Sequence, residues 1–163
     1  MAGVRLDGDF RRLTRALRNL SEVEFKQANK TIGQALREST MERFKTSKSP
    51  EGTSWQPKKV SDGKKILLKT ARLRNSIKSK ASDKGVAIGT NTIYAARHQF
   101  GDKKKVTIKA KTNKGLRFLT ANGWRRKKVV KVKMPARPFL GINEEDIQEI
   151  KGILNDIIEE ATQ

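Results

Sequence analysis

The sequence contains no cysteine and only one histidine, His98, among its 163 residues. The lack of cysteine excludes disulfides, thiol nucleophiles and cysteine-ligated metals. A single histidine argues against a histidine-ligated zinc site and against a relay of several histidines. We therefore expect neither an enzyme nor a protein that holds a metal or another cofactor.

Long apolar runs are also absent. No stretch approaches the roughly 18 apolar residues of a membrane span, and the opening residues, MAGVRLDGDFRRL, lack the apolar segment of a signal peptide. We expect a protein that makes no membrane contact and is kept in a cytoplasm. The length predicts a single domain over residues 1–163, and the 35% of hydrophobic residues is enough for one modest core.

Positive charge is what the sequence has in excess. Lysine and arginine number 37 against 17 acids, for a net charge of +20. Residues 102–138 hold 14 basic and 1 acidic side chains, whereas residues 139–163 hold 1 and 7. A charge of this size favours a polyanionic partner, or an assembly in which other chains neutralise it. The opposite signs suit a head-to-tail contact between copies, although a basic run can also be a solvated loop.

Helical periodicity is found near both ends of the chain. The spacing of Phe10, Leu13, Leu17 and Leu20 predicts a first helix over residues 10–20. A capping box of Ser21 and Glu24 predicts a second, which continues to residue 46. The last predicted helix is amphipathic and follows Asn143 as its N-cap, with acids in its first turn, where the helix dipole favours them. These acids form a candidate contact patch between subunits: Glu144, Glu145 and Asp146.

Shorter elements are expected between these helices. Residues 78–82 and 86–89 flank an Asp83-Lys84-Gly85 turn and predict a hairpin. Residues 94–100 predict a short helix that stops at Gly101. Leu67, Leu73 and Ile77 fit one face of either a short helix or an extended segment. The sequence is thus α+β, with two N-terminal helices, a small mostly antiparallel sheet and a C-terminal helix.

Residues 102–134 predict a long basic hairpin arm. Val106 and Ile108 alternate with polar residues, as do Val130 and Val132 on the return, and Asn122-Gly123 favours a tight turn. Paired in this way, the strands would bring two basic clusters together in a site for non-specific phosphate binding or for a neighbouring subunit. The cluster residues are Lys103, Lys104, Lys105, Arg125, Arg126, Lys127 and Lys128. Phe118 and Trp124 could stack on bases or pack against protein.

Catalytic patterns are weak. His98 has no serine or carboxylate close in sequence to complete a triad, so a nuclease built on it is a poor fit. No phosphate-binding glycine loop occurs. The four acids in the centre of the chain are spaced as turn residues rather than as a metal cage: Glu51, Asp62, Asp83 and Asp102.

Five short motifs in order resemble the phage virion morphogenesis family, found in Mu-like and related tailed phages. They are SPEGTSWQP, ILLKTARLRNSI, GVAIGT, IYAARHQFG and PARPFLGI, and an amphipathic helix follows them. The resemblance implies a structural protein of the virion, assembled in the host cytoplasm. It would act in tail completion or as a tail terminator, and it would form a ring that joins the tail tube to the capsid portal. The usual symmetry of tail tubes implies six subunits in that ring. Its partners would be neck and tail-tube proteins and the backbone of the phage DNA.

The resemblance also assigns structural roles to particular positions. A framework turn contains Pro50, Gly52 and Trp55, and the core contains Leu67, Leu73 and Ile77. Ala71 stands where the family usually has glycine. The remaining positions form a signature helix and a closing segment: Tyr94, His98, Gln99 and Gly101, then Ala136, Arg137, Pro138 and Phe139. The +20 charge leaves one alternative, a free nucleic-acid-binding protein without sequence specificity.

Overall fold

A computed structural model describes residues 25–61, 63–120 and 122–162 of the chain. The predicted first helix over residues 10–20 and the Ser21–Glu24 capping box lie outside the described residues. The described part has α+β architecture, with small antiparallel sheets and a C-terminal helix. None of its helices is long and apolar enough to cross a membrane.

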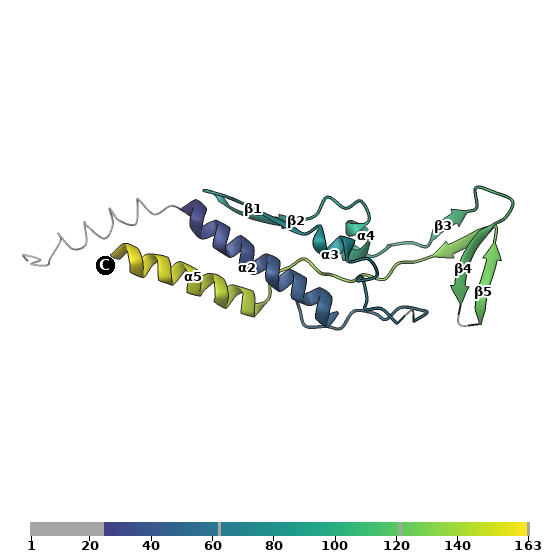
Figure 1. Cartoon of the computed structure of the whole chain (residues 1–163), viewed down its shortest axis with the longest axis horizontal. Helices are drawn as coiled ribbons and strands as arrows, with labels where there is room; N and C mark the ends of the chain where they lie inside the picture. The colour runs from purple at the N-terminus through teal and green to yellow at the C-terminus, as the bar shows by residue number, and fades with distance from the viewer. Residues whose placement is uncertain (1–24, 62, 121, 163) are drawn as a thin grey trace, which may run out of the picture.

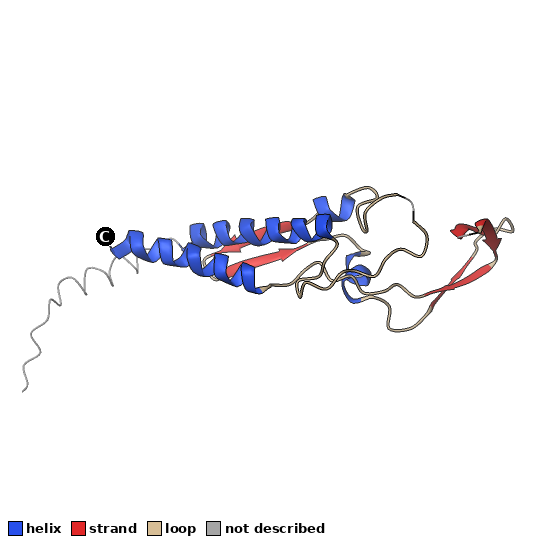
Figure 2. Ribbon diagram, turned by 90° about the horizontal axis from the view of Figure 1, so that it is seen from below, coloured by secondary structure: helices blue, strands red, loops and turns tan. Residues whose placement is uncertain are grey.

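Helix α2 (Phe25–Thr46) is the centre of the body. The C-terminal helix α5 (Glu144–Thr162) packs along one side of it, and a hairpin of β1 (Lys78–Ser82) and β2 (Gly85–Gly89) packs along another (Figures 1 and 2). Gly33 permits the close approach of the hairpin, because a Cβ there would lie 3.2 Å from Val86 Cγ1. The predicted β1–β2 hairpin and the C-terminal helix are confirmed.

The core lies at the carboxyl end of α2. Phe44 is fully buried, its ring centroid 5.6 Å from that of Trp55 and 5.2 Å from that of Phe139. The segment that the sequence left open contains a four-residue helix, α3 (Arg72–Asn75). It buries Leu73, and Ile77 is buried just after it, whereas Leu67 is half-buried at the edge of the core.

The basic segment after helix α4 (Ala95–Phe100) extends beyond the body (Figure 1). Strand β3 (Val106–Lys109) pairs with β6 (Val129–Val132), and β4 (Leu116–Thr120) pairs with β5 (Gly123–Lys127). The structure therefore has two successive strand pairs where the sequence predicts one long hairpin. A turn ending at Gly115, with φ of 76°, interrupts the ladder between them. We call residues 102–134 the arm, and β4 with β5 its tip.

Candidate assembly surface

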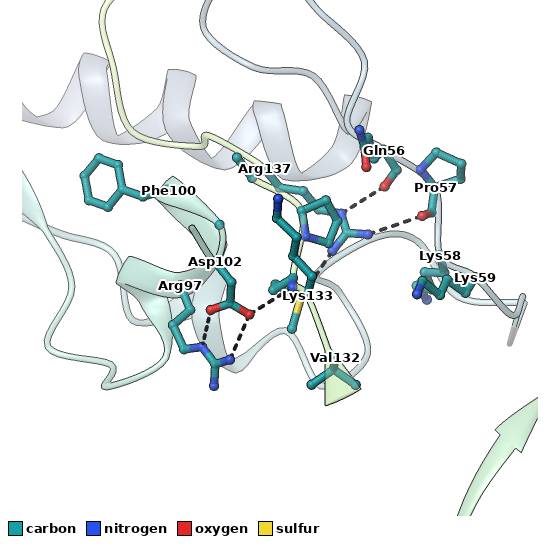
Figure 3. A pocket seen from close by; sticks show the side chains of 14 residues that line it. Gln56, Pro57, Lys58, Lys59, Arg97, Phe100, Asp102, Val132, Lys133 and Arg137 are labelled. Carbon is teal, nitrogen blue, oxygen red and sulfur yellow. Dashed lines mark hydrogen bonds and ion pairs between the residues drawn. The ribbon is translucent and has the colours of Figure 1, made fainter. Parts of the chain in front are cut away.

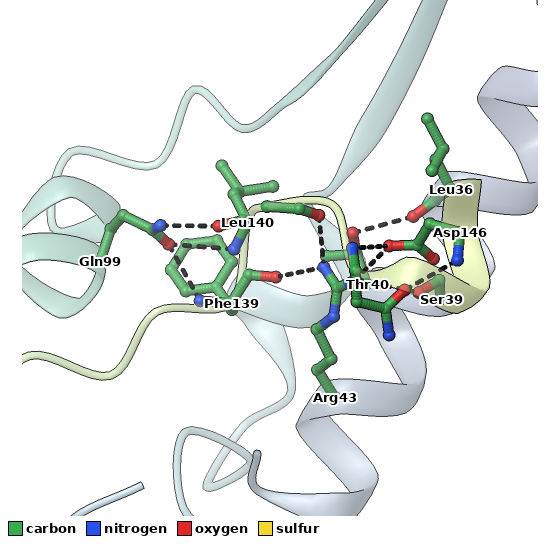
Figure 4. A network of polar contacts seen from close by, with 10 residues as sticks. Leu36, Ser39, Thr40, Arg43, Gln99, Phe139, Leu140 and Asp146 are labelled. Atoms are coloured by element: carbon green, nitrogen blue, oxygen red, sulfur yellow. Dashed lines mark hydrogen bonds and ion pairs between the residues drawn. The ribbon is translucent and has the colours of Figure 1, made fainter. Parts of the chain in front are cut away.

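The side chain of Gln99 joins helix α4 to the segment that leads into α5. Its Oε1 accepts hydrogen bonds from the backbone N–H groups of Phe139 and Leu140, at 2.9 and 3.0 Å. Its Nε2 donates to the carbonyl oxygen of Leu140 at 2.8 Å (Figure 4). One side chain thus satisfies backbone groups that would otherwise need a partner strand.

The framework turn reaches the same closing segment. Trp55 Nε1 donates to the Pro138 carbonyl at 2.8 Å. Arg137 Nε donates to the Gln56 carbonyl at 2.9 Å, and its Nη2 to that of Pro57 at 3.3 Å (Figure 3). These contacts explain why Arg137 is buried although it is charged, and burial lowers its pKa.

Gly101 completes this junction because no other residue fits there. Its φ is 68°, and a Cβ would lie 2.6 Å from the backbone nitrogen of Ala136. The backbone nitrogen of Arg137 donates to the His98 carbonyl at 2.7 Å. We define the motif junction as residues 50–57, 94–101 and 136–141. Three of the five motifs that carry the family resemblance meet here, in the body, and their contacts hold these segments together.

His98 is half-buried in the motif junction, with its ring edge-on to Tyr94 at 5.8 Å between centroids. Its Nδ1 is buried and has no hydrogen-bond partner among the described residues. The pKa of His98 is lowered, first by burial and then by the positive charges of Arg137 and Arg97. A catalytic histidine needs a group that orients it, and the described part of the chain supplies none at Nδ1.

Asp102 anchors the root of the arm. Arg97 holds its carboxylate through two hydrogen bonds, of 3.0 and 2.9 Å, and the backbone nitrogen of Met134 donates to it at 2.9 Å. The hydrogen bond from Arg97 is the main reason that the pKa of Asp102 is lowered. A cavity of about 810 Å³ opens beside this ion pair (Figure 3). Its charged lining includes Lys58, Lys59, Arg97, Asp102, Lys133 and Arg137.

The two basic clusters of the arm are not brought together. Val106 pairs with Val132, so Lys103–Lys105 lie at the base of the arm, level with residues 133–135. Residues 125–127 belong to β5 in the tip, and the carbonyl of Lys128 accepts from Ala110 at 2.8 Å at the far end of β3. The prediction of one seven-charge site is wrong, because β3 and β6 separate the clusters.

The tip has an exposed aromatic and basic face, in which the sequence indicated Trp124 and Arg126 but not Arg117 or Leu119. Arg117 lies opposite Arg126, and Leu119 lies opposite Trp124. The Trp124 side chain is 61% exposed, and the Arg117 guanidinium lies 4.3 Å from its ring centroid. The alternation of side chains along a strand places these four residues on one face of the tip. Phe118 is half-buried on the other face.

The predicted acidic patch is divided by the fold. Glu144 and Glu145 are exposed, but Asp146 is only 2% exposed and bonds Arg43 of the same chain at 2.5 Å (Figure 4). Asp146 also accepts from the backbone nitrogen of Asn143, whose side chain caps the backbone nitrogen of Asp146 in return. The assignment of Asp146 to an outward patch is therefore wrong, since its carboxylate neutralises a buried arginine.

Arg43 was missed because it lies on the inner face of α2, where an apolar residue is expected. It also donates to the carbonyls of Gly141 at 2.7 Å and Phe139 at 3.3 Å. Within the described residues, no group of three or more histidine, aspartate or glutamate side chains could hold a metal ion.

Comparison with known proteins gives a consistent result. The model of the phage virion morphogenesis family matches residues 8–159. The chain is 28% identical over 144 residues to tail completion protein S of Escherichia phage P2. The aligned region covers 88% of this chain and 90% of that protein. No solved structure matches it. The family match spans every motif of the junction described above, and the chain belongs to the phage virion morphogenesis family.

Proposed function

We propose that this chain is a structural protein of phage tail assembly, which completes the tail by forming a ring of identical subunits at the head–tail junction. The observation that carries the proposal is the arm. It extends beyond the body (Figure 1) and exposes apolar side chains along its whole length. These side chains are Val106, Ile108, Leu119, Trp124 and Val129.

Such an arm needs a partner surface. A two-stranded hairpin alone is at best marginally stable in water, and β5 is exposed at every position. Clustered exposed apolar side chains rimmed by polar ones are typical of protein–protein contacts. Burial against another chain is therefore the arrangement that stabilises the arm.

The charge distribution favours copies of the same chain as that partner. The arm is strongly basic and α5 is acidic, and the two surfaces point in different directions (Figure 1). A contact between two different patches on identical subunits is heterologous, and it closes into a ring when the rotation permits. The similarity to the tail completion protein of phage P2 supports a role in tail completion. In a neck ring of six, basic side chains not used between subunits would hold DNA phosphates in the lumen, and other neck and tail-tube proteins would bind the ring faces.

Light scattering of the purified chain tests the proposal. We expect a discrete closed oligomer at low and moderate salt, formed without DNA. The same measurement is repeated with a short random DNA duplex. A chain that stays monomeric and binds the duplex with a steep salt dependence would contradict the ring and support the free nucleic-acid-binding alternative.

A further inference from the structure

An acidic cleft lies between α2 and α5. Its volume is about 480 Å³, and exposed carboxylates from both helices line it. Arg43 and Asp146 also line it, but their charges cancel each other. Lys48 is the other positive residue of its lining. Glu42 is paired with Lys45 at 2.6 Å. The net charge of the cleft is still negative, and it comes from Glu38, Glu145 and Glu149.

The wall of the cleft also contains an unsatisfied polar group. Ser49 lines the cleft, and this residue is only 6% exposed. Its hydroxyl is buried and has no hydrogen-bond partner among the described residues. A buried hydroxyl without a partner is costly, so this wall of the cleft is not fully satisfied by the described part of the chain itself.

The exposed face of the tip has positive charge that is unpaired within the described residues, and this charge is complementary to the negative charge of the cleft. Arg117 and Arg126 lie directly opposite each other in the β4–β5 register. Like charges at such positions destabilise a strand pair, and this pair belongs to a hairpin that is marginal alone. Carboxylates placed against the two arginines would relieve the repulsion, and Trp124 beside them would lose its exposure.

The tip cannot reach the cleft of its own chain. β3 and β6 hold it away from the body (Figure 1). The cleft lies on the body, where its lining includes Asn143 and Glu145 at the start of α5. We propose that the Arg117–Arg126 face of the tip docks in the acidic cleft between α2 and α5 of a second copy of this chain. The inference rests on the proposed ring, for which it names the contact between subunits.

Charge reversal on each side tests the contact in the full chain. The variants are R117E/R126E in the tip and E145R/E149R in the cleft, followed by all four changes together. We expect each pair to weaken self-association in sedimentation velocity by about tenfold or more at low salt, and the combination to restore most of it. A combined variant no better than the weaker pair overturns the inference.

Matched controls separate the cleft from general charge effects. D156R/E160R reverses two exposed acids of the same helix outside the cleft, and K103E/K104E reverses two lysines at the base of the arm. We expect both to change association by less than about threefold. An equal loss in the controls would overturn the inference. If the cleft pair fails to fold by circular dichroism, the tip pair is decisive, since a tip variant that associates normally overturns it too.

A disulfide distinguishes failure of the contact from failure of the ring. The natural chain has no cysteine, so mixed R126C and E145C chains can form only the disulfides that these two positions allow. We expect a mixed R126C–E145C dimer on oxidation, and none when K80C replaces E145C. A closed oligomer without the mixed dimer overturns the contact but leaves the ring. The mixed dimer without a closed oligomer supports the contact and contradicts the ring, and the absence of both contradicts both.

Discussion

Ala71 adopts a backbone conformation in which glycine is the usual residue, with φ of 53° and ψ of 4°. It precedes α3 and starts the turn that places Leu73 in the core. A left-handed conformation costs a residue with a Cβ roughly 1–2 kcal/mol, a cost that glycine avoids. Glycine, however, loses more conformational entropy than alanine on folding, and this loss reduces the gain from the substitution. The family resemblance puts glycine at this position, and the geometry gives the reason.

Replacement of Ala71 by glycine should therefore raise the free energy of unfolding by about 0.5–1 kcal/mol. Chemical denaturation of the two chains measures the difference. Ala96→Gly is the matched control, since Ala96 is exposed in helix α4. There the same change should lower stability by roughly 0.5–1 kcal/mol. Destabilisation by both substitutions would show that the strain at Ala71 has no energetic weight.

His98 makes stability depend on pH near neutrality. Its pKa in the folded chain is lowered by burial and by Arg137 and Arg97, so the unfolded chain takes up the proton first. Stability is full above the unfolded pKa of about 6.5 and falls as the pH drops toward the folded pKa. We expect the melting temperature to fall between about pH 7.5 and about pH 5.5, and His98→Gln to flatten this dependence.

The folded pKa of His98 can be measured directly. The chain has one histidine, so its ring proton resonance in an NMR titration needs no assignment by mutation. A midpoint at or above the ordinary value of about 6.5 would contradict the expected direction.

Asp146 and Arg43 form the ion pair on which the start of α5 depends. Both are nearly buried, and removal of one partner leaves the other charge buried alone. Asp146→Ala should lower the free energy of unfolding by about 3–5 kcal/mol, measured by chemical denaturation. Glu144→Ala, which changes an exposed acid two residues earlier, should stay within about 0.5 kcal/mol of the natural chain. Equal effects of the two would mean that the pair has little energetic weight.

At the scale of elements, the arm tip is expected to be dispensable for folding. Ala110 and Lys128 face each other at the end of the β3–β6 ladder, so residues 111–127 can be replaced by an Asn-Gly turn that closes this hairpin. The core residues are untouched, and the melting temperature should change by no more than about 4 °C. Oligomers seen by light scattering should be lost. A shortened chain that still forms the same oligomer would show that the tip is not part of the contact.

Local signals in the sequence predicted most of the helices and strands, but they could not predict side-chain contacts between residues far apart in the chain. The β1–β2 hairpin, the end of α4 at Gly101 and the Asn143 cap depend on residues within a few positions of one another. Arg43 and Asp146 are 103 positions apart. The periodicity of apolar residues cannot predict that a charge on the inner face of α2 has a partner in α5. The Gln99 contacts span about 40 positions in the same way.

The arm shows a different limit of sequence reasoning. Its alternating valines and isoleucine lie in the paired strands β3 and β6, but the interruption before β4 depends on the turn at Gly115. The β3–β6 register, with Val106 opposite Val132, keeps the two basic clusters apart. A charge count alone cannot distinguish one seven-charge site from two smaller ones, because the distinction lies in the strand register.

At the scale of the whole molecule, the separation of charge predicts how association responds to salt. The screening length falls from about 10 Å at 0.1 M to about 3 Å at 1 M ionic strength. Self-association of the natural chain should weaken steadily over this range, whereas the contribution of apolar side chains that the proposed contact would bury, such as Trp124, should persist. Sedimentation velocity at several salt concentrations gives the slope. An association that strengthens with salt would indicate an apolar contact in which these charges take no part.

The closing segment also determines when the body can form during synthesis. Phe139, Asp146 and the backbone held by Gln99 leave the ribosome after the arm and after every other part of the core. A chain interrupted before Asp146 lacks the partner of Arg43 and one wall of the acidic cleft. In the proposed ring, such a fragment would offer its arm to a neighbouring subunit but would lack the complete cleft that receives an arm.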